Sequence, residues 1–262
     1  MKGKTTAQQA PIITVAAIKG GTAKTVTTAA LAQAAAFKGA RVLALDMDPQ
    51  ANLTAILGAK QTQAGTYSLL TGSGTAEGAI QETPQGIDIM EACRDLSTIT
   101  EERGMALRIL KALETVRDRY SLILIDVPPS AGVLVYAALY AADMVIAPTE
   151  ADPAGLQGLY NIADLTERMA KARKRSYKAG AIITRYDGRP KLNRHLHGVI
   201  EAKAGALGFP LLATIRNGVP IKEAMAMQEN IFTYCPKAKP ALDYMGLYET
   251  IMDILKGENT RA

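Results

Sequence analysis

Residues 19–25, KGGTAKT, place a lysine and a hydroxyl side by side behind two glycines. A phosphate-binding loop has the pattern G-x-x-x-x-G-K-[ST], in which the lysine reaches phosphate oxygens and the hydroxyl ligates Mg²⁺. Lys24 and Thr25 fit the end of this pattern. These residue types predict a site for a nucleotide phosphate, although an ordinary glycine-containing turn is the alternative.

The loop departs from the standard pattern at both of its glycine positions. Ile18 and Ala23 stand there, whereas Gly20 and Gly21 lie inside the loop. Glycine lets a phosphate approach the backbone without a Cβ in the way. An apolar run precedes the loop and a helix-forming run follows it, so its N–H groups would bind the ligand at a helix N-terminus.

Three carboxylates follow apolar runs that read as buried strands. Asp46 and Asp48 end the run VLALDMD, and Asp126 ends LILID. A buried carboxylate is costly unless it meets a cation or hydrogen-bond donors. One such residue is usually a helix cap, but three of them beside a Lys-Thr loop indicate a shared Mg²⁺-phosphate centre.

Short apolar runs alternate with helix-length segments along the chain. The predicted strands span residues 12–18, 41–46, 87–91, 122–126, 144–148, 179–184 and 211–215, and the main predicted helices span 24–38, 101–120, 154–174, 192–207 and 238–256. This alternation predicts an α/β fold, a single doubly wound and mostly parallel sheet flanked by helices, which binds ligands at the carboxyl ends of its strands. We expect one domain over residues 12–262 and a flexible tail over residues 1–11.

Composition excludes several classes of protein. The chain has 262 residues, of which 48% are hydrophobic and 21% charged, so it can bury a core. Its two cysteines, Cys93 and Cys235, are isolated, which argues against a disulfide framework or a zinc site. No apolar signal segment or run of membrane-spanning length occurs, so a cytoplasmic location is expected.

The net charge of +5 is unevenly distributed. Residues 168–222 contain 13 Lys and Arg but only two acidic residues, Asp187 and Glu201. Few aromatic residues interleave with these cations, and no helix-turn-helix or zinc pattern occurs. The composition suits contact with a nucleic acid backbone without base reading; a solvated, lysine-rich helix end is the alternative.

Four segments together resemble a known family. KGGTAKT, DMDPQAN, DVPPS and APTEADPAG occur in the order and at the spacing typical of the ParA/Soj partition ATPases, with their deviant Walker A, Walker A′ and Walker B motifs. The resemblance covers residues 12 to 256 and is closest to the short forms that lack an N-terminal helix-turn-helix domain. It implies an ATPase that binds ATP and Mg²⁺.

The resemblance also implies residue roles. Lys19 would be the signature lysine that reaches across a nucleotide-sandwich homodimer, and Glu150 the acid that holds it otherwise. Asp48 would orient the attacking water and Lys24 would bind the β- and γ-phosphates. Thr25 would ligate Mg²⁺ directly, and Asp46 and Asp126 through water. The nucleotide-binding set implied by these motifs is Gly20, Gly21, Thr22, Ala23, Lys24, Thr25, Val26, Asp46, Asp126 and Glu150.

Three positions depart from the family pattern. Ala23 replaces a usual glycine, which costs about 1–2 kcal/mol if that position needs a positive φ and is nearly neutral otherwise. We expect the change to be tolerated, because every catalytic side chain is retained. Val26 replaces a usual Thr. Arg216 stands where a Pro is common in the adenine-side segment 214–224, so base selectivity rests on the family alone.

Partners are also implied by the resemblance. Members of the family bind double-stranded DNA nonspecifically as ATP dimers, associate with the nucleoid in that state, and hydrolyse ATP under stimulation by a ParB-like centromere-binding protein. Arg189 matches a DNA-binding position, and the second family arginine falls at Pro220, so Arg216 or Lys222 would substitute. Lys174 and Arg175 complete the set of DNA-binding candidates.

Two alternatives remain open. The first is a MinD-like, membrane-cycling ATPase, which is disfavoured because the C-terminal segment 241–256 carries Asp243, Glu249 and Asp253 rather than a basic face. We expect that segment to pack on the domain and no membrane to be involved. The second is a nucleotide-gated DNA-binding module with little hydrolysis, should Ala23 distort the loop.

Overall fold

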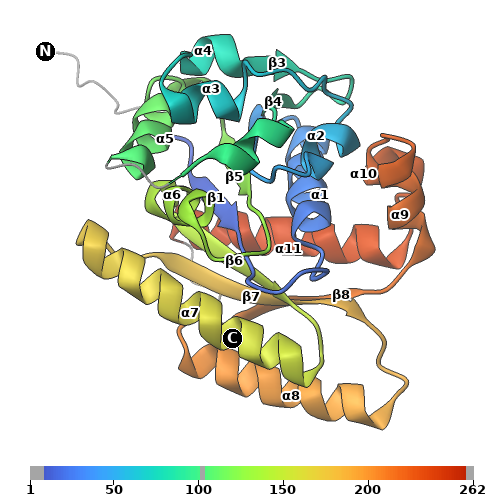
Figure 1. Ribbon diagram of the computed structural model, residues 1–262. Helices are drawn as coiled ribbons and strands as arrows, with labels where there is room; N and C mark the ends of the chain where they lie inside the picture. The colour runs from blue at the N-terminus through green and yellow to red at the C-terminus, as the bar shows by residue number, and fades with distance from the viewer. Residues whose placement is uncertain (1–8, 101–103, 258–262) are drawn as a thin grey trace, which may run out of the picture.

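A computed structural model describes residues 9–100 and 104–257 (Figure 1). Its eight strands form one sheet in the order β3-β4-β2-β5-β1-β6-β7-β8, and only the edge strand β3 is antiparallel to its neighbour. The strands are β1 (Ile12–Val15), β2 (Val42–Asp46), β3 (Ile80–Glu82), β4 (Asp88–Met90), β5 (Leu122–Asp126), β6 (Met144–Thr149), β7 (Lys178–Tyr186) and β8 (Leu211–Arg216). The predicted α/β class and mostly parallel sheet are confirmed.

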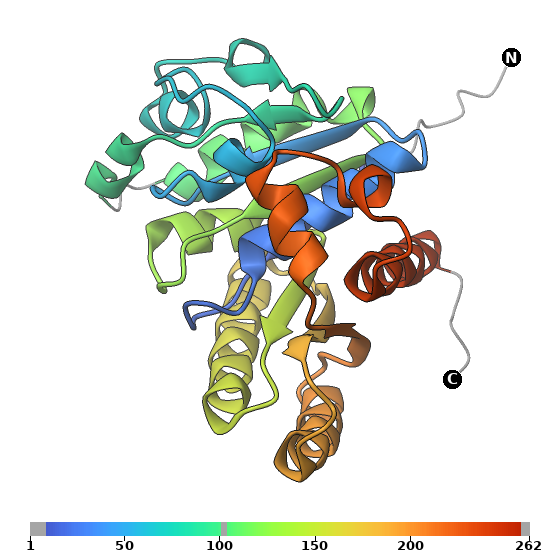
Figure 2. The same cartoon turned by 90° about the vertical axis from the view of Figure 1, so that its right-hand side faces the viewer.

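Helices cover both faces of the sheet (Figures 1 and 2). They are α1 (Lys24–Phe37), α2 (Asn52–Ile56), α3 (Thr66–Thr71), α4 (Ala76–Ala79), α5 (Met105–Glu114), α6 (Val133–Ala141), α7 (Pro153–Arg173), α8 (Lys191–Ala206), α9 (Val219–Ala226), α10 (Ile231–Tyr234) and α11 (Lys239–Lys256), with 3₁₀ turns η1 (Arg94–Thr98) and η2 (Arg117–Arg119). No helix within the described ranges is long and apolar enough to cross a membrane.

Alternate residues of the central strands supply two separate cores. In β2, Leu43 and Leu45 pack with α5, α6 and α7, whereas Val42 and Ala44 pack with α1 and α11 on the other face. A strand buried on both faces must be apolar throughout, which is why these strands appear in the sequence as continuous apolar runs.

The C-terminal helix packs against the body of the protein, as expected. α11 lies alongside α1 in both views and also contacts β8. Its apolar side chains, among them Tyr244, Leu247 and Ile251, are buried in the core on that face.

All seven predicted strands are present, but several boundaries differ. The predicted strand 12–18 ends at Val15, where the chain turns into the loop. The predicted helix 101–120 is observed as α5 followed by a 3₁₀ turn; residues 101–103 lie outside the described part. Strand β3 was missed because three half-exposed residues at a sheet edge carry no periodic signal.

The expected flexible tail is only partly within view. Residues 1–8 lie outside the described ranges, but Ala10 is 1% exposed and its carbonyl accepts a hydrogen bond from Arg117. The Pro11 carbonyl accepts another from the Ile123 amide. Pro11 is therefore paired with β5 and Ala10 is held by the Arg117 side chain, so the backbone pairing begins one residue before β1.

Candidate functional site

A cavity of about 560 Å³ lies at the carboxyl end of the sheet. The loop between β1 and α1 forms one wall, and the opposite wall comes from α2 and the end of α9. The predicted residues that line it are Gly20, Gly21, Thr22, Ala23, Lys24, Thr25, Val26 and Asp48. The structure thus gathers the predicted loop and Asp48 around one space of nucleotide size.

Ala23 has a left-handed backbone conformation, with φ 62° and ψ 31°, and forms the N-cap of α1. An L-residue with a Cβ pays about 1–2 kcal/mol for this conformation. Of the two cases considered from the sequence, the strained one therefore applies. Thr27 N nevertheless bonds Ala23 O at 2.9 Å, so the first turn of α1 forms in spite of the strain.

Lys24 is nearly buried, with 7% of the residue exposed, at the start of α1. Its Nζ contacts the Lys19 carbonyl at 3.5 Å. Burial lowers the pKa of Lys24, and the negative charges of Asp126 and Asp48 act in the opposite direction. The ammonium group therefore stands between the loop backbone and two of the predicted carboxylates.

Asp46 and Asp126 lie directly opposite each other on the neighbouring strands β2 and β5. Both are fully buried, and burial followed by mutual repulsion raises the pKa of Asp126; burial also raises that of Asp46. Asp126 Oδ1 accepts a hydrogen bond from Thr28, whereas Oδ2 has no hydrogen-bond partner among the described atoms. A hydrogen bond from Thr25 and the charge of Lys24 act to lower the pKa of Asp126, but burial and the charge of Asp46 outweigh them.

Donors from α2 and the preceding loop fix the orientation of Asp46. The Thr54 amide and hydroxyl both donate to Asp46 Oδ2 at 2.8 Å. The Asp48 amide donates to Oδ1 at 3.1 Å. These bonds link the beginning of α2 and Asp48 to the end of β2.

Lys19 projects from the loop toward the beginning of α7 and does not line the cavity. Its Nζ lies 2.8 Å from Asp152 Oδ2 and 3.4 Å from Glu150 Oε2. Burial acts to lower the pKa of Lys19, but the two carboxylates outweigh it and raise the pKa. Glu150, the acid predicted for it, lies beside Lys19, and Asp152, which was not predicted, makes the shorter contact.

Asp152 carries a second role that its sequence context could have indicated. Its carboxylate accepts a hydrogen bond from the Gly155 amide and caps α7, whose first residue is Pro153. An Asp followed by Pro is a recognised helix-start signal.

Arg185 is a second residue of the site that was not predicted. It lies near the end of β7, directly after Thr184, and has a φ of 53°. Its side chain lines the cavity and lies 3.4 Å from Glu150.

Three glutamines join the walls of the cavity; we call them the glutamine clamp (Gln33, Gln85 and Gln228). Gln85, in the turn between β3 and β4, donates to the carbonyls of Ile56 at 2.8 Å and Gln228 at 3.0 Å. Gln33, which is fully buried in α1, donates to Gln85 Oε1 at 2.8 Å.

The clamp acts on two helix ends that border the cavity. Gln228 donates to the Ala55 carbonyl at 2.9 Å, so α2 is bonded directly to the segment after α9. The lining residues Ala55, Ile56 and Gln228 all belong to these two segments. No motif in the sequence marks the clamp, because its members lie more than 50 residues apart and meet only through the fold.

The predicted DNA-binding residues fall into separate places. Arg189 and Arg216 line a second cavity of about 550 Å³ together with Lys239, which was not predicted. Lys222 lies next to Arg216 in a small adjoining pocket. Lys174 and Arg175 instead precede β7 and lie at the opposite end of that strand from Arg189.

Both predicted arginines of this second cavity are paired with acids. Arg189 bonds Asp187 through Nε at 2.9 Å and Nη2 at 2.6 Å, and Arg216 bonds Asp243 through Nε at 2.9 Å and Nη2 at 2.6 Å. Arg189 is 90% exposed, and exposed pairs of this kind contribute only about 0–1 kcal/mol. A phosphate can therefore displace Asp187 at little cost, whereas Asp243, which is 13% exposed and also accepts from the Arg216 amide, holds Arg216 more firmly.

Comparisons with known proteins give consistent matches. A family model described as an AAA domain matches residues 10–179. The chromosome-partitioning ATPase Soj of Thermus thermophilus is 35% identical, covering 92% of this chain and 94% of that protein. The chromosome partitioning protein ParA of Caulobacter vibrioides is 31% identical, covering 96% and 97%.

Solved structures include one with a ligand. A cobyrinic acid a,c-diamide synthase from Mycobacterium smegmatis, with bound ATP analog and magnesium, has a TM-score of 0.82 and 26% identity, covering 95% of this chain and 97% of that one. The fold is therefore shared over almost the full described length.

Proposed function

Because the chain belongs to the ParA/Soj family of partitioning proteins, we propose that it is a partition ATPase that binds ATP and Mg²⁺ in the cavity at residues 20–26. The diamide synthase structure, with its ATP analog and magnesium, supports the nucleotide part of this proposal. Since all eight strands share one sheet, we also propose that residues 12–257 fold as one domain.

One observation carries the proposal. Two buried carboxylates, Asp46 and Asp126, face each other beside Lys24, and Asp126 Oδ2 lacks a partner among the described atoms. A hydrated Mg²⁺ fits this place, because it is bound by a few carboxylates, waters and substrate phosphates. When bound, Mg²⁺ neutralises negative charge that develops on the transferred phosphoryl group.

The chain's own residues then divide the work. Lys24 and the loop amides hold the phosphates, and Thr25 together with Asp46 and Asp126 orders the cation. Asp48 lines the cavity and is 7% exposed, which suits a carboxylate that orients an attacking water. Such a reaction needs positioning and positive charge rather than a covalent intermediate.

Lys19 supports a role between subunits. It points away from the cavity of its own chain and is held by Asp152 and Glu150 at α7. In the proposed ATP-bound homodimer, Lys19 would leave these acids and contact the partner's phosphates. The acids thereby hold the lysine until a more negative ligand, a nucleotide triphosphate, competes for it.

The second cavity, with Arg189, Arg216 and Lys239, is the proposed site for nonspecific DNA and hence for association with the nucleoid. Cations of this kind bind phosphates without reading sequence. Hydrolysis, stimulated by a ParB-like partner, would return the protein to the monomer. A MinD-like function gains no support, since the apolar face of α11 is buried against α1 and β8.

The proposal is tested by measuring retention on a labelled DNA duplex by fluorescence anisotropy, with ATP, with ADP and without nucleotide. ATP should increase affinity, and the double variant Arg189→Ala/Arg216→Ala should lose this increase and lower the salt slope by about two. Phosphate release and mass with ATP are measured alongside.

A protein that remains monomeric with ATP and releases no phosphate would contradict the proposed ATPase activity. Release of phosphate with no change in DNA affinity would leave an ATPase whose output is something other than DNA binding. Dimerisation and DNA retention without phosphate release would identify the nucleotide-gated DNA-binding module instead.

A further inference from the structure

A second group of cations lies at the end of the sheet where the parallel strands begin, far from Arg189. We call it the lower patch (Arg117, Arg173, Lys174, Arg175 and Lys178). Arg175 and Lys178, with Arg117, line a cavity of about 400 Å³. The eight residue steps of β7 place this patch about 26 Å from Tyr186, beside which the Arg189 cavity begins.

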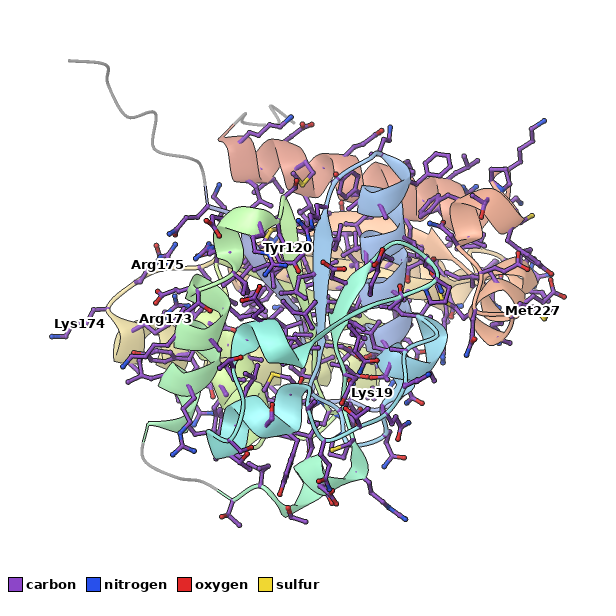
Figure 3. The ribbon with its side chains drawn as sticks, turned by 90° about the horizontal axis from the view of Figure 1, so that it is seen from above. Lys19, Tyr120, Arg173, Lys174, Arg175 and Met227 are labelled. Atoms are coloured by element: carbon purple, nitrogen blue, oxygen red, sulfur yellow. The ribbon has the colours of Figure 1, made fainter. Side chains whose placement is uncertain are left out.

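The lower patch is also remote from Lys19. Lys19 contacts Asp152 at the N-terminus of α7, and Lys174 is the C-cap of the same 21-residue helix, so about 30 Å separates them. Figure 3 shows Arg173, Lys174 and Arg175 together at one margin of the protein, with Lys174 pointing outward and away from Lys19.

Structural roles account for only part of the lower patch. Arg173 donates to the carbonyls of Leu139 and Ala142 and stacks on Tyr140 and Tyr177. Arg117 is 11% exposed and paired with Asp143. These two arginines hold the fold together and are not available to a partner.

The remaining three cations are exposed, although two of them already have partners in the fold. The Lys174 amide bonds the Lys171 carbonyl at the end of α7, but its side chain makes no hydrogen bond or ion pair with any residue in the described ranges, and its φ of 54° is left-handed. Arg175 is 58% exposed although paired with the same Asp143, and Lys178 bonds carbonyls at the end of α11. Among the described residues that line this cavity, Asp143 is the one acid beside Arg117, Arg175 and Lys178, so cations outnumber acids there.

Neighbouring cations of α7 behave differently. Arg168 and Lys171 are paired with Asp164 and Glu167 one turn earlier, at 3.0 Å and 2.7 Å. Basic residues at the C-terminus of α7 interact favourably with the helix dipole, which contributes about 0.3–1 kcal/mol. It does not explain why the unbalanced charge continues past the helix end to Lys178.

The chemistry of the surface selects its partner. None of the exposed large hydrophobic residues found in the described ranges belongs to the lower patch. A membrane anchor needs an apolar face, and a protein interface needs an apolar core. A surface on which cations outnumber acids and no large apolar side chain is exposed suits a polyanion bound through its phosphates.

We propose that the lower patch is a second DNA-backbone site that is open without nucleotide. This inference rests on the proposed function, since it assumes that the two subunits meet at the face that carries Lys19. The patch lies at the other end of α7, so each subunit keeps it exposed in monomer and dimer alike. The monomer would hold DNA weakly through Lys174, Arg175 and Lys178 before ATP binds.

The test measures binding of nucleotide-free protein to a labelled duplex. With three phosphate contacts, affinity should fall about 40-fold between 50 and 200 mM salt. Lys174→Glu should weaken nucleotide-free binding about tenfold at 50 mM salt. Lys174→Gly, which removes the charge and suits the positive φ, should act in the same direction and excludes misfolding as the cause.

The matched control is Lys60→Glu, an exposed lysine near β3 that makes the same change in net charge. In the absence of nucleotide, this variant should bind the duplex as tightly as the unmodified protein does. Loss of the ATP-dependent increase in Arg189→Ala/Arg216→Ala, with nucleotide-free binding intact, would separate the two sites.

The inference is overturned if nucleotide-free protein does not bind the duplex at 50 mM salt, or binds it equally well after Lys174→Glu. Binding to phosphatidylglycerol vesicles in place of duplex would also overturn it. Failure of the proposed function looks different: ATP would have no effect, while nucleotide-free binding would still depend on Lys174.

Discussion

Lys19 Nζ lies 2.8 Å from the Asp152 carboxylate, which is also the cap of α7. With side chains 27% and 41% exposed, such a pair contributes about 0.2–1 kcal/mol. The contact is therefore strong enough to hold Lys19 in one place and weak enough to be exchanged for a phosphate.

Asp152→Ser removes the competing charge and keeps a residue that caps helices. The ATP concentration that gives half-maximal dimer should fall by about 1.4- to 5-fold, as the energy of the lost pair requires. Light scattering at graded ATP concentrations measures it. Asp164→Ser, which breaks an exposed pair on the same helix, is the control; an unchanged midpoint in Asp152→Ser would show that the pair does not restrain Lys19.

Lys24→Ala should reduce affinity for both ATP and ADP by about 100-fold, since it removes charge-assisted bonds from a site that is 7% exposed. Isothermal titration calorimetry measures the change. Lys38→Ala just after the far end of α1, where the lysine pairs with Glu249, should leave affinity unchanged. Normal ATP affinity in Lys24→Ala would place the nucleotide elsewhere.

Asp48→Ala should slow phosphate release by about 10²–10⁴-fold, the usual contribution of a residue that positions or deprotonates the attacking water. ATP binding and the ATP-dependent dimer should persist, because within the described ranges the Asp48 carboxylate hydrogen-bonds the Gln50 amide and no residue of the loop or of the Lys19 pair. Phosphate release and mass are followed in the same sample, with the exposed Asp118→Ala as control. Normal turnover would remove Asp48 from the reaction.

Ala23→Gly should raise the free energy of unfolding by about 0.5–1 kcal/mol. It relieves about 1–2 kcal/mol of left-handed strain at φ 62°, less the greater freedom of glycine in the unfolded chain. Urea unfolding measures it. Ala36→Gly, later in the same helix, should lower stability by about 0.5–1 kcal/mol. A loss of stability in Ala23→Gly would contradict the strain.

Gln85→Glu should raise KM for ATP about 30-fold while kcat changes little. A glutamate still accepts from Gln33 but cannot donate to the carbonyls of Ile56 and Gln228, and each lost bond costs about 1 kcal/mol. Steady-state kinetics gives both constants. The exposed Gln157→Glu on α7 is the control.

The split between KM and kcat separates positioning from simple stability. A lower melting temperature with unchanged KM in Gln85→Glu would mean that the glutamine clamp supports the fold and not the cavity. A second substitution of similar size, Gln85→Met, removes all three bonds and should raise KM at least as much.

The parallel sheet, the loop that follows β1 and the carboxylates at the strand ends could all be predicted from the amino-acid sequence. Each of these signals is local: an apolar run of strand length specifies a buried strand, and a residue that follows it must lie at the sheet's carboxyl edge. Asp46 and Asp126 could therefore be placed together before any coordinates existed, because parallel strands bring their ends to one edge.

Only the tertiary structure decided which distant side chains meet. The positive φ of Ala23, the contact of Lys19 with Asp152 and the glutamine clamp all depend on how loops settle across the sheet. The basic segment is continuous in the sequence, but its cations form two separate surfaces at the two ends of β7. They are separated because the extended strand crosses the protein between them. Charge along a sequence fixes how many cations there are, and the path of the backbone fixes which of them act together.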